Sequence, residues 1–279
     1  MVFRHKYEYF IPILVFPQKL CRTITFICSG RKMAVILQLK VEKILIINYK
    51  IMRSKIIAFG DSIIKGVLLN IETNGQTHYA LADNNIVDQV AQHLRVDPVN
   101  LGKMGCTIEV GERILDRHLS GIENANYALL CYGGNDSDYD WRAIAQSPHA
   151  EHLPKTPISV FEKTYARIID KLRQAGITPL VMSLPAMDAE RYFEFFTSKF
   201  SAGEKSNVLK WLKGSTDTIW AGHELYNDAV KRVASAADVP LIDVSMAFKD
   251  LRKCLCADGI HPSRAGQANI ATAIAHVII

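Results

Sequence analysis

Between residue 52 and the carboxyl terminus, short apolar runs alternate with longer segments that repeat apolar residues at helical spacing. The apolar runs lie at residues 55–60, 98–102, 127–132, 178–184 and 239–243, and the helical segments lie at residues 84–94, 109–118, 160–175, 221–237 and 264–277. Strands that alternate with helices form βαβ units, which bury a parallel sheet between two layers of helices. Because such crossovers are right-handed, the pattern predicts a three-layer α/β/α sandwich around a five-stranded parallel sheet.

The first 51 residues differ in composition from the rest of the chain and set off one predicted domain, residues 52–279. They hold 9 basic and 2 acidic side chains, whereas the remainder is slightly acidic. An apolar run follows Met52 almost at once, so we interpret residues 1–51 as an extension outside the fold, either a mis-called start or a poorly packed arm. A secretion signal is the alternative, but Pro12 interrupts its apolar core and no cleavage site of small residues follows.

Charge, hydropathy and cysteine spacing narrow the class of protein. The slightly acidic body gives no basic surface for nucleic acid, and no apolar run approaches the ~18 residues of a membrane-spanning helix. The 6 cysteines form no Cys-x-x-Cys pair and no zinc-binding spacing with histidine. These features predict a cytoplasmic protein with reduced thiols, without a metal site, a nucleic-acid partner or a membrane span.

Four short polar loops follow apolar runs or precede the last helical segment, and each holds a residue suited to acyl-transfer chemistry. They are Gly60-Asp61-Ser62, residues 100–107, Gly133-Gly134-Asn135-Asp136 and Asp258-Gly259-Ile260-His261-Pro262. Loops at the carboxyl ends of parallel strands meet at one edge of the sheet. There, Ser62 can present a hydroxyl at a helix N-terminus, Asn135 can donate to an oxyanion, and the carboxylate three residues before His261 can orient its imidazole. Each loop taken alone also fits an ordinary turn or helix cap.

The four loops together resemble the SGNH (GDSL-like) hydrolase family, over nearly all of residues 52–279. The matching positions are Phe59-Gly60-Asp61-Ser62, Gly105, Gly133-x-Asn135-Asp136 and Asp258-x-x-His261, with Ile63 where the family usually has Leu. The resemblance implies a flavodoxin-like sheet and a serine esterase that hydrolyses esters or thioesters through a covalent acyl-enzyme.

The family's motifs also imply a role for each matching residue of this chain. Ser62 would be the nucleophile, His261 the general base and then acid, and Asp258 the residue that orients the imidazole. The backbone N–H groups of Ser62 and Gly105 and the side chain of Asn135 would form the oxyanion hole. This chemistry implies neither a metal nor an organic cofactor.

The substrate is predicted from two long connections and a few side chains beside the loops. Residues 137–160 form a connection long enough for a lid, and residues 187–218 are expected to form helices along one side of the site. His223 is interpreted as part of a solvated helix face. We expect a small-molecule ester with a small acyl group, such as acetyl on a carbohydrate, because no long apolar groove is evident. The candidate substrate-binding residues are Asp61, Asp136, Tyr139, Trp141 and Arg191.

Three other interpretations stay open at this point. A metal-dependent phosphoesterase also uses Asp, Asn and His after strands, but the Gly-Asp-Ser loop has no second Asp or His ligand beside it, and a chelator would test it. A non-catalytic flavodoxin-like binding module would not require Ser62 and His261 to meet. An inert family member would fold in the same way, although all the motif residues are present.

Overall fold

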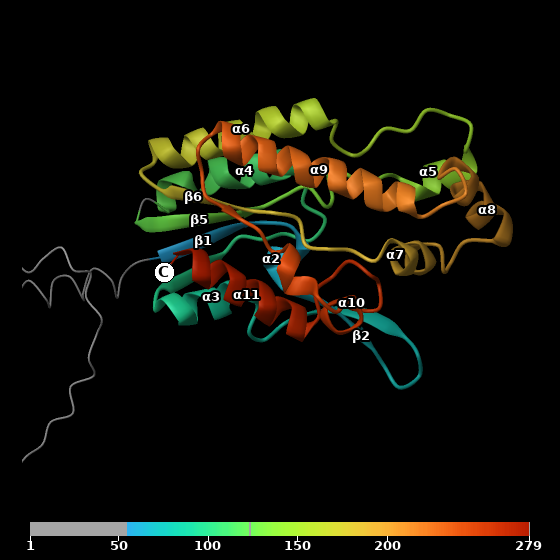
Figure 1. Cartoon of the computed structure of the whole chain (residues 1–279), viewed down its shortest axis with the longest axis horizontal. Coiled ribbons are helices and arrows are strands. Elements are labelled where there is room, and N and C mark those ends of the chain that lie inside the picture. Colours follow the sequence, from blue (N-terminus) through green and yellow to red (C-terminus); the bar gives the residue numbers. More distant parts are fainter. Residues whose placement is uncertain (1–54, 123, 279) are drawn as a thin grey trace, which may run out of the picture. The chain divides into compact units, whose positions relative to one another are not determined.

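Five parallel strands form the central sheet of the computed structural model, which describes residues 55–122 and 124–278 (Figure 1). Their order is β4-β1-β5-β6-β7. This arrangement confirms the predicted three-layer sandwich and is the strand order of a flavodoxin-like sheet. The predicted extension, residues 1–51, lies outside the described residues. The strands are β1 Lys55–Gly60, β4 Asp97–Asn100, β5 Ala125–Cys131, β6 Thr178–Met182 and β7 Leu241–Ile242.

Helices cover both faces of the sheet (Figure 1). The first face carries α4 (Ile108–His118), α6 (Ile158–Gln174) and α9 (Asp217–Ala236), and the second carries α3 (Ile86–Leu94) and α11 (Arg264–Ile278). Alternate side chains of β1 enter the two layers: Ile57 and Phe59 join the core under the first face, and Ile56 and Ala58 join the core under the second. All four are buried, which explains why residues 56–59 are all apolar instead of alternating with polar residues.

The two edge strands are shorter than the sequence predicts. The apolar run at 239–243 forms only the two-residue strand β7, and β4 ends at Asn100 instead of continuing to residue 102. Pro98 lies in β4, where an edge strand can accommodate a residue without a backbone N–H.

An antiparallel hairpin that the sequence analysis missed follows the first loop. It consists of β2 (Val67–Ile71) and β3 (Thr77–Leu81), and Gly75 in its turn has a φ of +82°. The Asn74-Gly75 pair is a hairpin signal, but the flanking strands lack a clear alternation of apolar and polar residues, which hid the hairpin in the sequence.

The two long connections fold as helices at one end of the sheet (Figure 1). Residues 137–160 contain α5 (Trp141–Gln146), and residues 187–218 contain α7 (Ala189–Phe196) and α8 (Ala202–Trp211), as expected for the second connection. These helices share an apolar cluster of their own, separate from the two cores of the sheet. In the part of the chain that the structure describes, no helix combines the length and apolar character needed to cross a membrane. Short helical segments complete the fold at α2 Ser62–Lys65, Leu119–Gly121, Ser245–Phe248 and α10 Leu251–Cys254.

Candidate active site

The site lies at the carboxyl edge of the sheet, where the chain crosses from one side of β1 to the other. After β1 the chain adds β4 on one side, and after β4 it crosses to β5 on the other side. The loops after these strands diverge around a crevice, the usual ligand position in sheets of this type. Ser62 follows β1, Gly105 follows β4 and Asn135 follows β5, and all three line one pocket there.

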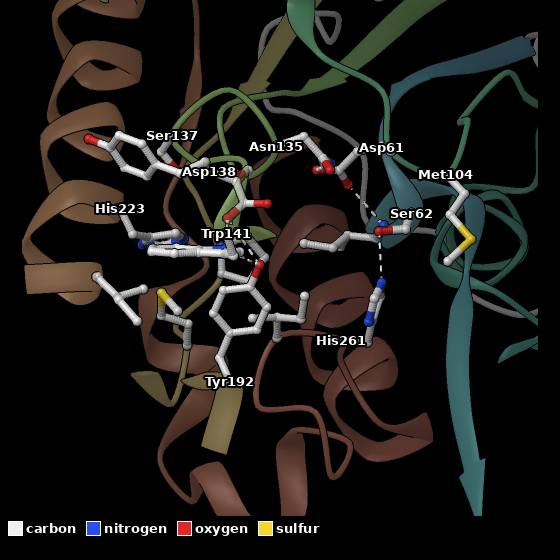
Figure 2. A pocket seen from close by; sticks show the side chains of 18 residues that line it. Asp61, Ser62, Met104, Asn135, Ser137, Asp138, Trp141, Tyr192, His223 and His261 are labelled. Atoms are coloured by element: carbon white, nitrogen blue, oxygen red, sulfur yellow. Dashed lines mark hydrogen bonds between the residues drawn. The ribbon is translucent and has the colours of Figure 1, made fainter. Parts of the chain in front are cut away.

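Ser62, His261 and Asp258 form a continuous chain of hydrogen bonds. The Ser62 Oγ atom lies 2.8 Å from His261 Nε2 (Figure 2), and His261 Nδ1 lies 2.6 Å from Asp258 Oδ2. Asp258 Oδ1 also accepts the backbone N–H groups of Ile260 and His261, at 3.2 and 3.1 Å. Both Asp258 and His261 are buried, so bulk water competes little for these bonds. A carboxylate, an imidazole and a hydroxyl in this order can move a proton away from the hydroxyl.

The Asp258 carboxyl is ionised although it is buried. Burial on its own would raise the pKa of Asp258, but the hydrogen bond and charge of the His261 ring, together with two backbone N–H groups, hold that pKa below its ordinary value. The carboxylate therefore favours a proton on Nδ1 of the imidazole, which leaves Nε2 to accept the proton of Ser62.

A closed loop holds the carboxylate and the imidazole together. The Cys256 N–H donates to the carbonyl of His261 at 2.8 Å and closes the loop. Gly259 lies at the turn with a φ of +76°, and a Cβ there would meet the Asp188 carbonyl oxygen at 2.6 Å. The turn thus requires glycine, both for its left-handed conformation and for the close approach of another backbone.

Asp61 holds the side chain of Asn135 beside the nucleophile (Figure 2). Asn135 Nδ2 donates to Asp61 Oδ2 at 3.1 Å, while Asp61 Oδ1 accepts the N–H of Ile63 at 2.9 Å and caps α2. The amide of Asn135 carries two N–H groups, so one stays available for a substrate oxygen. Asp61 is buried, and this burial raises the pKa of its carboxyl above the ordinary value.

Gly105 brings open backbone to the same pocket. Its φ is +69°, and apart from Gly105 itself and its two chain neighbours no described atom lies within 4 Å of the position that a Cβ would occupy. An oxygen of a ligand can therefore approach the backbone N–H of Gly105 without meeting a side chain.

The pocket has a volume of about 200 Å³ and extends from the nucleophile toward larger side chains. Figure 2 shows Ser62 and His261 at one end, and Trp141 and His223 at the other. Sites for drug-sized ligands usually span ~300–1,000 Å³, so this pocket suits a small group of atoms. Its apolar walls include Ile63, Pro185, Met187, Ile219 and Ile260.

Three of the five predicted substrate-binding residues line this pocket, namely Asp61, Tyr139 and Trp141. Trp141 stacks on Phe196, with ring centroids 4.6 Å apart, and only 8 % of the residue is exposed. Most of its surface is therefore committed to packing, and a limited part faces the pocket.

The structure corrects the prediction for Asp136, the fourth candidate substrate-binding residue, because it places this side chain inside the protein. It is completely buried, and its Oδ1 accepts the N–H of Ile108 at 2.9 Å, the first residue of α4. Burial raises the pKa of Asp136 to about 6. Its contacts tie the loop after β5 to the start of α4, and it does not line the pocket.

The structure also corrects the prediction for Arg191, the fifth candidate substrate-binding residue, because its guanidinium binds other parts of the protein away from the pocket. It pairs with Asp188 at 2.7 Å and donates to the carbonyl oxygens of Leu251 at 3.1 Å and Cys256 at 3.3 Å. These bonds connect α7 to the segment that leads into the Asp258 loop, so Arg191 stabilises the position of that loop without lining the pocket.

The structure adds polar pocket residues that the sequence analysis did not select. Asp138 Oδ1 accepts the Trp141 Nε1–H at 2.7 Å and the Tyr192 hydroxyl at 3.0 Å, and Lys155 pairs with Oδ2 at 2.7 Å. His223, interpreted from the sequence as solvated, lines the pocket instead. No motif marks these positions, because their helices come together only in the folded chain.

Comparisons with known proteins agree with the fold and with the motifs. No curated protein matches the chain. Among solved structures, LAE5, an alpha/beta hydrolase enzyme from the metagenome of Lake Arreo, is 20% identical, with a TM-score of 0.54 and coverage of 80% of this chain and 94% of that chain. A catalytic mutant of Axe2, an acetylxylan esterase from Geobacillus stearothermophilus, is 17% identical, with a TM-score of 0.53 and coverage of 81% and 94%. A putative lipolytic protein of the G-D-S-L family from Desulfitobacterium hafniense is 15% identical, with a TM-score of 0.52 and coverage of 81% and 99%.

The family assignment rests on the sequence itself. The model of the GDSL-like Lipase/Acylhydrolase family matches residues 58–268, which include all four motif loops. This match covers well over half of the chain and confirms the resemblance drawn from Ser62, Gly105, Asn135 and His261. The chain therefore belongs to the GDSL-like lipase/acylhydrolase family and is a carboxylic ester hydrolase.

Proposed function

We propose that this chain hydrolyses its ester through an acyl-enzyme on Ser62, with His261 and Asp258 as the proton-transfer partners. The observation that carries the proposal is the unbroken hydrogen-bond chain from Asp258 to Ser62, with distances of 2.6 and 2.8 Å. Its position at the crevice of the sheet, beside Asn135 and Gly105, supports the same assignment.

In the first half-reaction, Ser62 Oγ attacks the carbonyl carbon of the ester while His261 Nε2 takes the hydroxyl proton. The carbonyl oxygen becomes an oxyanion, which the N–H groups of Ser62, Gly105 and Asn135 stabilise. The bond to the alcohol oxygen then breaks, and His261 returns its proton to the departing alcohol. Asp258 stabilises the imidazolium that exists between these two proton transfers.

In the second half-reaction, water replaces the alcohol. His261 takes a proton from the water as its oxygen attacks the acyl carbon, and the same oxyanion site is used again. The bond to Ser62 Oγ breaks, and His261 gives the proton back to Ser62. The net reaction converts ester and water to acid and alcohol. Ser62 and His261 end in the protonation states in which they began, so no further reactant is needed.

The proposed substrate is an ester with a small acyl group, such as acetyl on a carbohydrate. The pocket of about 200 Å³ supports a small group, and the aromatic side chains of Tyr139 and Trp141 offer surfaces on which a sugar ring can pack. Axe2, with a similar fold, is an acetylxylan esterase.

The cytoplasmic location remains part of the proposal. Cys106, Cys131, Cys254 and Cys256 are free thiols in the structure. Free cysteines are typical of a reducing compartment, which supports this location. Fractionation of cells followed by detection of the protein tests it.

The decisive experiment substitutes the nucleophile and follows p-nitrophenyl acetate hydrolysis. Ser62→Ala and His261→Ala should each abolish turnover, and the double variant should be scarcely slower, because the two residues act as one unit. A sulfonyl fluoride should inactivate the unaltered enzyme and add the mass of its sulfonyl group to the Ser62 peptide, with release of fluoride. Full activity in Ser62→Ala would overturn the proposal.

Two controls separate the esterase from the other functions. His149→Leu, at an exposed position, should keep its activity and shows that loss is specific to the site. EDTA should leave activity unchanged, whereas a loss that zinc or manganese restores would favour the phosphoesterase. In the described residues, no group of three or more His, Cys, Asp or Glu side chains could hold a metal ion.

A further inference from the structure

His223 brings a polar ring to the end of the pocket opposite the nucleophile. It lies on α9, lines the pocket, and is separated from Ser62 and His261 by the length of the cavity (Figure 2). Ile219, one helical turn earlier on the same face of α9, and Met187 line the same pocket with apolar side chains. A ring with two hydrogen-bonding nitrogens is costly among apolar groups unless a partner satisfies it.

The hydrogen bonds of His223 are incomplete within the protein. Its side chain is 12% exposed, and its Nδ1 atom is buried without a hydrogen-bond partner among the described residues. The nearest carboxylate oxygen, Glu224 Oε1, lies 3.5 Å from Nδ1. Because Nδ1 is buried and the residue lines the pocket, Nε2 is the ring nitrogen that can meet a ligand there.

A second set of contacts fixes the carboxylate next to this ring. Glu224 Oε2 accepts the Asn227 Nδ2–H at 3.2 Å, and Asn227 Oδ1 accepts the buried N–H of Leu184 at 2.9 Å. The interaction with His223 lowers the pKa of Glu224, so its carboxyl is ionised at neutral pH. The loop after β6 thus anchors Asn227, which positions Glu224 beside the imidazole.

We propose that His223 binds a hydroxyl group of the ester substrate at the far end of the pocket. A hydroxyl both donates and accepts hydrogen bonds, so it satisfies Nε2 in either tautomer of the ring. The ionised Glu224 nearby disfavours an anionic group at this position. His223 is therefore a specificity-determining residue. It selects an ester whose hydroxyl lies as far from the reacting carbonyl as His223 lies from Ser62.

The hydroxyl can belong to either half of the ester. On the alcohol side it would be a sugar or polyol hydroxyl, and on the acyl side it would lie near the end of a hydroxylated acyl chain. The inference rests on the proposed esterase function, because it concerns the same pocket.

The experiment compares two matched pairs of substrates in His223→Leu, His223→Gln and the unaltered enzyme. The alcohol pair is a mono-O-acetylated xylose and cyclohexyl acetate, which differ mainly in hydroxyl groups. The acyl pair is the p-nitrophenyl ester of an ω-hydroxy acid and that of the alkanoic acid with the same number of heavy atoms. p-Nitrophenyl acetate serves as the reference, because it carries no hydroxyl group.

We expect His223→Leu to lose about 10-fold to 100-fold in kcat/KM for the hydroxylated member of one pair. The substrate hydroxyl would then be buried in the pocket without a hydrogen-bond partner. Its hydroxyl-free counterpart and p-nitrophenyl acetate should be hydrolysed at nearly unaltered rates. His223→Gln should recover part of the loss, since an amide also donates and accepts. The pair that responds identifies the half of the ester that carries the hydroxyl.

Two results would overturn the inference: no change for any substrate, or an equal loss for both members of each pair, which would mark a structural role. His149→Leu is the matched control for an added leucine. Retention of hydrolysis in Ser62→Ala would instead defeat the proposed function, so the two failures are distinguishable.

Discussion

The side-chain amide of Asn135 has two N–H groups, one bound to the protein and one available to the substrate. Asp61 holds one N–H at 3.1 Å, so the direction of the other is set before an ester arrives. A donor fixed in advance costs no reorganisation when the carbonyl oxygen becomes an anion. We therefore propose that Asp61, although it lines the pocket, acts on the reaction through Asn135 rather than by contact with the substrate.

Removal of this donor should weaken the transition state more than substrate binding. We predict that Asn135→Ala lowers kcat by about 10²-fold to 10³-fold with a smaller change in KM, because the donor matters most once the oxyanion exists. Steady-state kinetics with p-nitrophenyl acetate measure both constants, and a thermal melt checks the fold. A raised KM with unaltered kcat would contradict the assignment.

Asp136 should make stability fall as pH rises. Its pKa is raised by burial from 3.8 to about 6, so the folded chain binds this proton more tightly than the unfolded chain does. The contribution of Asp136 to the free energy of unfolding, about 3 kcal/mol, is complete below pH ~4 and is lost as the pH rises through ~6. Asp136→Asn keeps an acceptor for the Ile108 N–H and removes the titration.

Urea unfolding of both proteins at pH 5 and pH 8 measures this effect. The difference in unfolding free energy between the variant and the unaltered enzyme should grow in the variant's favour at the higher pH. All other titrating groups are shared, so their contributions cancel in the comparison. Parallel pH profiles would show that Asp136 does not titrate in this range.

At the scale of elements, the β2–β3 hairpin supplies a wall to the triad. Tyr79 on β3 meets the His261 ring edge to face, with centroids 5.2 Å apart and an angle of 61°. Burial and the Asp258 carboxylate raise the pKa of Tyr79 to about 12, so its hydroxyl keeps its proton over the working pH range. The contact of the ring, rather than its ionisation, is what the hairpin contributes.

Two substitutions separate the ring of Tyr79 from its hydroxyl. Tyr79→Ala should lower kcat/KM by about 2-fold to 10-fold, because an aromatic contact of this kind contributes roughly 0.5–1.5 kcal/mol. Tyr79→Phe should keep most of the activity and leave the pH profile of kcat/KM unchanged. If both variants lose activity equally, the hydroxyl is the important group and the packing argument is wrong.

At the scale of the whole molecule, all the site residues come from the part of the chain that the family model matches. That match begins at residue 58, and the basic charge excess lies before residue 52. We predict that a chain beginning at Met52 keeps the melting temperature and the kcat/KM of the full chain. Differential scanning fluorimetry and ester hydrolysis test this, and a melting temperature lower by several degrees would contradict it.

Patterns among near neighbours were enough to predict the framework and the four loops. The apolar runs and helical periods each depend on residues within one element, and they predicted the order of the main strands and helices. Because strands in a parallel sheet share one carboxyl edge, the same patterns predicted that Ser62 and His261, 199 residues apart, would meet.

The roles of individual polar side chains were decided only by the tertiary structure. Asp136 and Arg191 turn away from the pocket because α4 and the segment 251–256 offer them partners. Tyr79 and His223 reach the site because a hairpin and a long helix pack beside it. Whether a polar side chain faces a ligand or another backbone depends on contacts between distant segments, and no local pattern in the sequence encodes those contacts.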